Sequence, residues 1–521
     1  MATKRRYPIG IQTFWEIATQ NYVYADKTAY IHKMASVGKY YFLNRPRRFG
    51  KSLLISTMKA YFEGRRELFD GLALGKLETR WVTYPVIRLD FSVGKYYTLE
   101  RTHTILNGLL KDYEQELGIN AEDPHGYGER MKNIIRAAHR QTGLQVVVLI
   151  DEYDAPMLDT IDKPLIQEQI RNCMRDFFSP LKSQADNLRF VFLTGISKFS
   201  QLSVFSELNN LKNISFDPTF EGICGITEEE LLTTMSPDIQ WLAQQSGQTY
   251  EHIVQELKRM YDGYHFSSRM TDIYNPWSLL NAFDMGDIQN FWFATGTPTS
   301  LIQLLQKHHL DLPDLEGIQA SLERFDAPTD RITDPIPVLF QSGYLTLKGY
   351  EPATGTFTLD FPNEEVYRGF ANSLYKYYCE DYPDNSNQVN VAFRALQQGE
   401  CEIGEFLEVI RRFYSAIPYS ITNKNERHYQ SILYTLLAAI GADVSAEVET
   451  ATGRMDMILR GKNAIYIFEF KYDGDANTAL RQILEKNYPV RFASDPRPKI
   501  AVGINFSSAS RTIEDYLVAH C

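Results

Sequence analysis

Residues 146–152 read VVVLIDE, five apolar residues followed by two carboxylates. A short apolar run rich in β-branched residues is typical of a strand buried on both faces of a parallel sheet. Such a strand has no structural need for acids at its carboxyl end, whereas ligands of open α/β sheets bind there. We therefore predict that Asp151 holds a Mg²⁺ ion and that Glu152 polarises an attacking water. Two solvated residues at a strand end are the alternative.

Other apolar runs extend this pattern along the first half of the chain. Residues 40–43, 86–89 and 190–193 also predict buried strands, and helical spacing recurs near 50–62, 99–117, 126–142 and 163–184. Strands that alternate with helices predict a mostly parallel sheet with helices on both faces. The expected fold class is therefore α/β.

A second motif lies at the end of the first predicted strand. Residues 42–54 read FLNRPRRFGKSLL, in which Gly50, Lys51 and Ser52 form the end of a phosphate-binding loop. Gly lets the backbone approach a phosphate, Lys51 would reach the β- and γ-phosphates, and the Ser52 hydroxyl would ligate Mg²⁺. The full pattern, G-x-x-x-x-G-K-[ST], fails at its first position, where the chain has Arg45. A capped helix start with an exposed Lys is the alternative for the triplet alone, but the acids of 146–152 favour a nucleotide site.

We extend the predicted nucleotide contacts to the rest of this loop and to the third strand. The loop contributes Arg45, Arg48, Phe49 and Leu53. Thr194 ends the strand over 189–193 and would contact the γ-phosphate or the attacking water, although a plain turn is an equal alternative on spacing.

Two more questions about this region stay open. Asp154 would either support the Mg²⁺ ligands or cap the helix before Pro156. No arginine finger is identifiable, since Arg47, Arg48, Lys198 and Arg269 are equally open candidates for contacting the phosphates.

These motifs resemble the bacterial AAA-ATPase-like family of P-loop NTPases. The resemblance rests on RPRRFGKS, LIDEYDAP and FLTGISKFS, with FEGICGIT, YDGYHFS and IYNPWSLL further on, and it covers roughly residues 5–285. Arg in place of the first Gly is common in this family. The resemblance implies ATP as the nucleotide, with Lys51, Ser52, Asp151 and Glu152 holding the nucleotide, the metal and the water.

A second chemical site is predicted near the C-terminus. Residues 453–472, GRMDMILRGKNAIYIFEFKY, indicate a hairpin with strands over 455–459 and 464–472. Glu469 and Lys471 share one face of the second strand, and Asp456 on the first could lie beside Glu469. Two carboxylates and a Lys suit metal-assisted phosphodiester hydrolysis, in which the acids hold Mg²⁺ and the amine orients or activates a water. A surface ion pair is the alternative.

This arrangement resembles the PD-(D/E)xK nuclease superfamily over roughly residues 405–521. A preceding helix would supply Glu426 as a third acid, and a following helix carries Gln482. Met455, rather than Pro, precedes Asp456. The resemblance implies DNA as the substrate, with Glu426, Asp456 and Glu469 at a Mg²⁺ site that could also take Mn²⁺.

Between these two regions, the sequence predicts a connecting module. We expect an ATPase-like domain over 1–275, a helical lid or winged-helix-like module over 276–404, and a small α/β nuclease-like domain over 405–521. From 405 to 521 the chain has 14 Lys and Arg and 14 Asp and Glu, so the net charge of −11 lies entirely upstream. An acidic total therefore says little about a nucleic-acid substrate.

Composition narrows the setting. No apolar run approaches the roughly 20 residues that span a bilayer, so we expect no membrane segment. Five scattered cysteines without CxxC spacing favour a reducing compartment, hence a cytoplasmic protein, and disfavour a zinc site. The leading hypothesis is an ATPase that regulates a Mg²⁺-dependent DNA nuclease. A homo-oligomer is a possible assembly of this chain. The alternative is an ATP-driven signalling or binding switch whose nuclease-like domain recognises a partner or nucleic acid without cutting it.

Overall fold

The structure is a computed structural model that describes residues 4–120, 123–161, 163–198, 211–292, 299–327, 334–378, 383–415, 417, 425–450 and 453–521. The chain divides into two compact units, each built from two stretches. Unit 1 comprises Met1–Phe291 and Gly317–Asn363, and unit 2 comprises Trp292–Glu316 and Glu364–Cys521. The predicted middle region, 276–404, thus contributes residues to both units, and the three-domain division stays a prediction.

Unit 1 contains a five-stranded sheet in which every described pairing is parallel. The strand order is β2-β3-β4-β1-β5, and the strands are β1 (Tyr40–Asn44), β2 (Val86–Asp90), β3 (Val146–Asp151), β4 (Leu188–Gly195) and β5 (Lys212–Asn213). All residues of β1 and β3 are buried, as their unbroken apolar sequences predict. Because β4 lies between β1 and β3, the ends of these three strands meet at one edge of the sheet.

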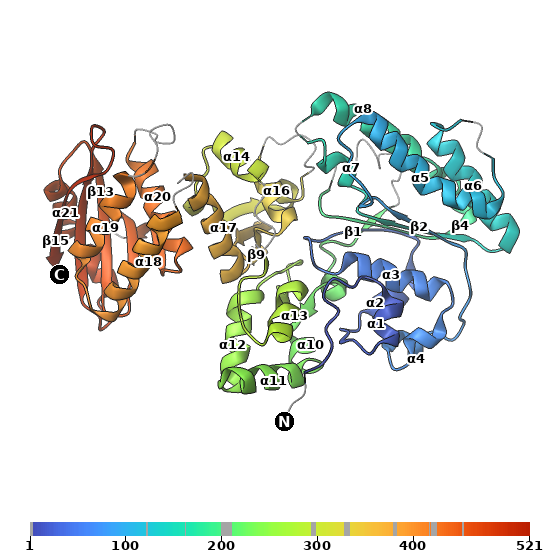
Figure 1. Cartoon of the computed structure of the whole chain (residues 1–521), viewed down its shortest axis with the longest axis horizontal. Helices are drawn as coiled ribbons and strands as arrows, with labels where there is room; N and C mark the ends of the chain where they lie inside the picture. Colours follow the sequence, from blue (N-terminus) through green and yellow to red (C-terminus); the bar gives the residue numbers. More distant parts are fainter. Residues whose placement is uncertain are drawn as a thin grey trace. The chain divides into compact units, whose positions relative to one another are not determined.

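Helices cover both faces of this sheet (Figure 1). One face packs against α5 (Leu99–Leu117), α6 (Tyr127–Thr142) and α8 (Pro164–Phe178), beside the short α7 (Ala155–Leu158) and α9 (Pro180–Ser183). The other face is covered by α1 (Phe14–Thr19), α2 (Thr28–Val37), α3 (Lys51–Phe62) and α4 (Ala73–Leu77). The predicted α/β fold class is confirmed.

In unit 1, a layer of helices comes after the parallel sheet along the chain. It contains α10 (Glu228–Leu232), α11 (Ser236–Ser246), α12 (Tyr250–Tyr261) and α13 (Pro276–Met285), together with the two-stranded pair β6 (Ile226–Thr227) and β7 (Ile273–Tyr274). Asn275 caps α13 by accepting the backbone N–H of Trp277 at 2.9 Å, with Pro276 at the first helical position. The layer shares a hydrophobic core with Tyr7 and Val23 from the start of the chain.

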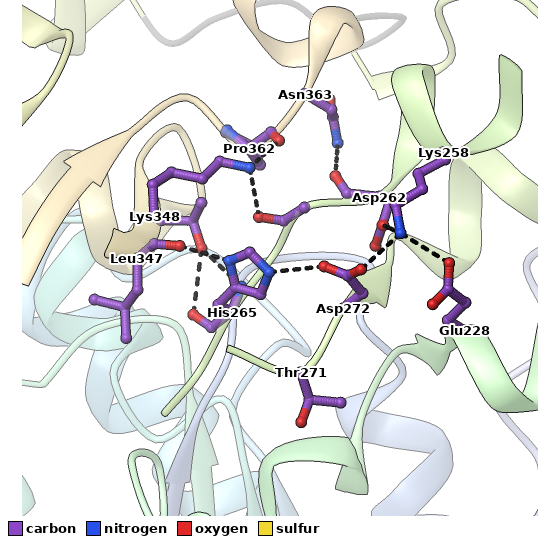
Figure 2. Close-up of polar contacts among 12 residues, drawn as sticks. Glu228, Lys258, Asp262, His265, Thr271, Asp272, Leu347, Lys348, Pro362 and Asn363 are labelled. Atoms are coloured by element: carbon purple, nitrogen blue, oxygen red, sulfur yellow. Dashed lines mark hydrogen bonds and ion pairs between the residues drawn. The ribbon is translucent and has the colours of Figure 1, made fainter. Parts of the chain in front are cut away.

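Unit 1 is completed by a three-stranded antiparallel sheet of order β8-β10-β9. Its elements are β8 (Ile318–Ser321), β9 (Thr346–Glu351) and β10 (Thr356–Asp360), with α15 (Leu322–Phe325) and α16 (Ile336–Ser342). Figure 2 shows how a polar cluster joins β9 to the end of α12: Lys348 Nζ donates to the carbonyls of Gly263 at 3.0 Å and Pro362 at 2.6 Å. Gly263 has φ +87°, and a Cβ there would collide with the Pro362 carbonyl.

Unit 2 is built on a second five-stranded sheet of order β11-β12-β13-β14-β15. All described pairings are antiparallel except β13 with β14. The strands are β11 (Val444–Thr450), β12 (Gly453–Arg460), β13 (Ile465–Tyr472), β14 (Lys499–Phe506) and β15 (Ile513–His520). The predicted hairpin over 455–472 corresponds to β12 and β13.

Helices of unit 2 come from both of its stretches. The first stretch holds α14 (Thr299–Lys307) and the 3₁₀ turn η5 (Leu312–Leu315), and the second holds α17 (Glu364–Tyr378), α18 (Pro383–Gln398), α19 (Ile403–Ser415), α20 (Glu426–Ala439), α21 (Ala476–Glu485) and the 3₁₀ turn η6 (Tyr488–Phe492). Leu312 and Leu315 of η5 are fully buried, which anchors that turn in the unit. Among the helices that the structure describes, none is long and apolar enough to cross a membrane.

Candidate nucleotide and nuclease sites

The phosphate-loop residues lie between β1 and α3, as predicted. Gly50, the N-cap of α3, has φ +88°, a left-handed conformation that favours Gly. Lys51 is 5% exposed, and its Nζ donates to the loop's own carbonyls at Arg45 and Pro46, both at 3.0 Å. Burial lowers the pKa of Lys51, opposed by the nearby carboxylates of Glu152, Asp154 and Asp151. The loop thus holds a buried cation whose present hydrogen-bond partners are neutral.

Asp151 lies next to this loop. The Ser52 hydroxyl donates to its carboxylate, while its Oδ1 is buried without a hydrogen-bond partner among the described residues. Burial raises the pKa of Asp151 to about 6 despite that hydrogen bond. A Ser hydroxyl beside a carboxylate with an unused buried oxygen is the ligand set expected for Mg²⁺, which usually binds through one or two protein oxygens, phosphates and waters.

Glu152 and Thr194 flank Asp151 from two strands. Glu152 has φ +49°, which is unusual for a residue with a side chain. This conformation changes the direction of the backbone directly after β3. Thr194 is fully buried, and its Oγ1 has no hydrogen-bond partner in the described chain. Its place at the end of β4, between β1 and β3, fits a polar contact to a group bound at this edge.

Asp154 does not cap the helix that follows it, whereas its support of the Mg²⁺ ligands stays a prediction. It is the N-cap of α7 but makes no side-chain capping bond. Instead its Oδ2 accepts the backbone N–H groups of Ile196 at 3.0 Å and Ser197 at 2.7 Å, directly after Thr194. A Cβ at Gly195 would collide with the same carboxylate, so Gly195 makes this approach possible. Burial raises the pKa of Asp154 to about 6. The last two residues of FLTGISKFS, 199 and 200, lie outside the described residues.

Arg45, predicted as a nucleotide contact, directs its side chain into the protein. Its Nη1 donates to the carbonyls of Asn44 at 3.0 Å and Ser215 at 2.8 Å, and its guanidinium lies 4.0 Å from the Phe266 ring centroid. It is 2% exposed, and burial lowers its pKa to about 10. Arg45 therefore stabilises the loop through these buried contacts. A Gly at this position would have no side chain to make them.

Two neighbouring loop residues, Phe49 and Arg48, pack against aromatic rings. Phe49 packs edge-on against Tyr264 and Phe266. Arg48 lies over the Trp277 ring at 4.5 Å and donates to the Phe291 carbonyl at 3.1 Å. Of the open finger candidates, Lys198 forms an ion pair with Asp326, and Arg269 donates to the Pro218 carbonyl at 3.2 Å.

A mostly apolar cavity opens beside Gly50 and Leu53. It is lined by the start of the chain, the first turn of α3, the segment before α10, and α13, through residues that include Val23, Tyr24, Ile223, Ile226 and Leu280. Ile223 and Ile226 belong to FEGICGIT and Leu280 belongs to IYNPWSLL, but these motifs did not predict a cavity, because its walls come from four distant segments. It offers an apolar surface next to the phosphate loop.

The second predicted site is assembled in unit 2, at the end of β13. Asp456 Oδ2 accepts the backbone N–H of Phe470 at 2.8 Å, which places Asp456 beside Glu469 as predicted. Glu469 is 1% exposed, Gln482 Nε2 donates to its Oε1, and its Oε2 is buried without a partner in the described chain. Lys471 Nζ lies 3.5 Å from Glu469 Oε1 and donates to the Phe470 carbonyl at 2.9 Å.

Burial sets the charge state of these acids. It raises the pKa of Glu469 to about 8, with the Asp456 carboxylate adding to the shift and Lys471 opposing it. Burial also raises the pKa of Asp456 and of Glu426. Two crowded carboxylates with an unused buried oxygen fit a divalent cation, which would supply the missing positive charge. Among the described residues, no three Asp, Glu, His or Cys side chains already converge on one metal position.

Sequence reasoning missed Glu447. In the β11–β12 pairing, Ala446 is opposite Met457 and Val448 is opposite Met455, so Glu447 faces Asp456 across the ladder. It has φ +53°, a strained value for this residue, and its charge raises the pKa of both Glu426 and Asp456. Arg454 pairs with it at 2.5 Å.

Glu426, Glu447 and Asp456 line a cavity of about 710 Å³. Its opposite wall is the η5 segment, from which Asp311 accepts the Ser431 hydroxyl at 2.8 Å and Asp314 forms an ion pair with Arg427. Glu316 accepts the Tyr434 hydroxyl. The η5 segment, which carries Asp311, Asp314 and Glu316, thus packs against α20, the helix that carries Glu426.

Comparison with known proteins gives matches at both sites. The model of the AAA-ATPase-like family, described as a predicted AAA-ATPase, matches residues 8–205, and that of a PD-(D/E)XK nuclease superfamily group matches residues 424–516. A curated relative from Azotobacter chroococcum mcd 1, named "Uncharacterized protein in vnfD 5'region", is 33% identical over 535 residues, covering 99% of both chains.

Two solved structures from Aeropyrum pernix also match. The ORC1 protein in complex with DNA is 11% identical and has a TM-score of 0.26, with 92% of this chain and 98% of that chain covered. The ORC2 protein, in ADPNP and ADP complexes, is 13% identical and has a TM-score of 0.23, with 64% of this chain and 87% of that chain covered.

Proposed function

This chain belongs to the AAA-ATPase-like family and carries a C-terminal PD-(D/E)XK nuclease superfamily domain, and we propose from this premise that it hydrolyses ATP to control a metal-dependent DNA nuclease. One observation carries the proposal. At both sites a strand carries a buried carboxylate with an oxygen that has no hydrogen-bond partner among the described residues, Asp151 Oδ1 and Glu469 Oε2. Leaving such an atom unpaired costs about 1–3 kcal/mol, which bound cations would offset.

At the first site, each residue has a distinct task. Lys51 exchanges its two loop carbonyls for phosphate oxygens, which return a full charge partner to a buried cation. Ser52 and Asp151 would hold Mg²⁺, which would supply charge neutralisation at the phosphates. Glu152 orients and deprotonates the attacking water, and Thr194 holds the γ-phosphate or that water. The apolar cavity beside Gly50 and Leu53 accepts the adenine ring.

At the second site, Asp456, Glu469 and Glu426 would hold a Mg²⁺ or Mn²⁺ ion. When bound there, such an ion would supply polarisation of the scissile phosphate and a water of lowered pKa. Lys471 orients that water, and Gln482 fixes the Glu469 carboxylate through the hydrogen bond to Oε1. Positioned groups of this kind typically contribute factors of 10²–10⁴ to a rate.

The η5 segment supports a regulatory link. Trp292–Glu316 lies within unit 2, yet the chain continues from both of its ends into residues of unit 1. Its carboxylates line the same cavity as Glu426 and Asp456. Asp314 forms an ion pair with Arg427, which would otherwise be available to contact a DNA phosphate. We propose that nucleotide-dependent movement in unit 1 withdraws this segment and opens the cavity.

One experiment tests both activities. Purified protein is incubated with plasmid and linear DNA, with and without ATP and with Mg²⁺, Mn²⁺ or EDTA, beside the Lys51→Ala, Glu152→Gln and Glu469→Ala variants. We expect Lys51→Ala to lose ATP binding, and Glu152→Gln to bind ATP but to hydrolyse it at least 100-fold more slowly. Glu469→Ala should lose DNA cleavage while hydrolysing ATP normally. DNA loss that survives Glu469→Ala, or ATP turnover that survives Lys51→Ala, refutes the corresponding assignment.

The regulatory link has its own test. Replacing Asp311 and Asp314 by Asn together should raise DNA cleavage in the absence of ATP, because Arg427 is released. Glu400→Gln, an exposed acid of the same unit that does not line the cavity, is the matched control. Unchanged ATP-independent cleavage in the double variant would refute the role of the segment. DNA binding without any cleavage, in wild-type protein, would favour the binding switch.

A further inference from the structure

We propose that unit 2 holds nucleic acid in a second groove, distinct from the carboxylate-lined cavity, through its phosphate backbone. The groove has a volume of about 470 Å³ and lies between α17, α18, the end of α20 and the turn between β12 and β13. Its lining includes three cations, Arg368, Arg394 and Lys462, and no carboxylate among the described residues. The choice of nucleic acid as the ligand rests on the proposed function, whereas the anion-binding character does not.

The groove is held together by hydrogen bonds across its elements. Gln397 of α18 accepts the backbone N–H of Lys462 at 2.6 Å through its side chain, and its carbonyl accepts Asn463 Nδ2 at 3.0 Å. These bonds fix α18 to the turn between β12 and β13. On the opposite side, Gly441 has φ +79°, and a Cβ there would lie 2.7 Å from Nη2 of Arg368. Gly at this position therefore leaves room for the guanidinium.

The charges in the groove are available to a ligand. Arg394 and Lys462 are exposed, and neither side chain has an ion-pair partner within the described part of the chain. Arg368 is partly neutralised, because its Nη1 donates to Glu364 at 3.0 Å. In a chain with a net charge of −11, a concave surface with cations and without acids is the type of site that attracts polyanions.

The layout favours a strand of nucleic acid over a small anion. The three cations come from three separate elements instead of converging on one point. Asn387, Asn390, Arg394 and Gln397 follow one another at helical spacing along α18, a row of about 15 Å at 1.5 Å per residue. That length matches about four nucleotide steps of 3.4 Å. Asn, Gln and Arg side chains on one helix face contact phosphates and base edges.

The groove also has a defined relation to the proposed cutting site along the chain. Lys462 lies in the turn before β13, and Glu469 lies four residues after Ile465, the first residue of that strand. At about 3.3 Å per residue, the strand from Ile465 to Glu469 spans roughly 13 Å, or about four nucleotide steps. A substrate that occupies both positions therefore needs roughly eight nucleotides, and we expect both affinity and cleavage to fall for shorter DNA.

The test is a binding measurement that does not depend on cleavage. Full-length protein in EDTA is titrated against fluorescent 20-nucleotide single-stranded and duplex DNA at several salt concentrations. The Arg394→Ala/Lys462→Ala double variant should weaken binding about tenfold or more. It should also reduce the salt slope by roughly 1.4–1.8, because each lost phosphate contact removes about 0.7–0.9. Lys376→Ala, an exposed cation of α17 outside the groove, should change neither quantity.

The outcomes separate this inference from the nuclease proposal. Wild-type protein that does not bind DNA in EDTA, or a double variant that binds like wild type with the same slope, overturns the groove. Full displacement of DNA by equimolar inorganic tripolyphosphate also overturns it, since a small anion would then be the better ligand. Groove-dependent binding without Glu469-dependent cleavage supports the groove and overturns the nuclease assignment.

Discussion

His265 lies between two acceptors: its Nε2 is 2.9 Å from Oδ1 of Asp272, and its Nδ1 is 2.6 Å from the Leu347 carbonyl (Figure 2). Asp272 also accepts from Lys258 at 2.8 Å, and Lys258 pairs with Glu228 at 2.8 Å. The cluster thus ties α10 and α12 to β9.

His265→Ala should therefore destabilise unit 1. It removes the donor of the buried Leu347 carbonyl, and an unsatisfied buried group costs about 1–3 kcal/mol, while Asp272 keeps its hydrogen bond from Lys258. Urea unfolding followed by circular dichroism measures the change in the free energy of unfolding. His252→Ala on the exposed start of α12 is the matched control and should change it by less than about 0.5 kcal/mol. Equal effects of the two substitutions would contradict the bridging role of His265.

Asp262 predicts a pH dependence of stability. It is 2% exposed, its Oδ1 has no partner among the described residues, and burial raises its pKa to about 7. The unfolded chain has the ordinary pKa of about 3.9, so the favourable contribution is complete below that value and is lost as the pH rises through 7.

Asp262→Asn should consequently be more stabilising at pH 8 than at pH 5, by on the order of 2 kcal/mol. Thermal unfolding at both pH values measures the difference. The Asn side chain keeps an oxygen for the Gly263 N–H that the carboxylate accepts. A stability difference from wild type that is the same at both pH values would rule out the charged carboxylate as its cause.

Arg45 and Arg47 should respond differently to truncation. Arg45 is buried against two carbonyls and Phe266, whereas Arg47 is exposed in the same loop. Arg45→Ala should cost about 2–4 kcal/mol of stability, because buried acceptors lose their partner and a cavity remains. Arg47→Ala should leave stability unchanged. Calorimetric ATP titration, beside thermal unfolding, checks this: weaker ATP binding by Arg45→Ala at unchanged stability would show a direct phosphate contact.

Asp154 should act as a positioning residue for Thr194. Asp154→Ala removes the acceptor of the Ile196 and Ser197 N–H groups, so the end of β4 should loosen and ATP turnover should fall about tenfold or more. Asp154→Asn keeps one oxygen for these groups and should retain most of the turnover. Steady-state kinetics measure the ATP turnover of both variants, and thermal unfolding measures their stability. Equal losses would indicate that the charge of Asp154, and not its acceptor geometry, is required.

The sequence by itself determined the local parts of both sites. The run VVVLIDE predicts a buried strand that ends in Asp151 and Glu152, and alternation along 465–472 places Glu469 and Lys471 on one face. These predictions succeed because burial on both faces requires an unbroken apolar run, and strand geometry fixes side-chain direction every two residues. The order of Gly50, Lys51 and Ser52 at a helix start is equally local.

Only the tertiary structure decided which distant residues complete the sites. The role of Arg45 depends on Ser215 and Phe266, far along the chain, and Thr194 gains its place because β4 inserts between β1 and β3. Glu447 meets Asp456 through strand register, and the acids of η5 reach α20 across more than a hundred residues. Such pairings follow from the packing of whole elements and from loop closure, which hydrophobic periodicity within a short window does not encode.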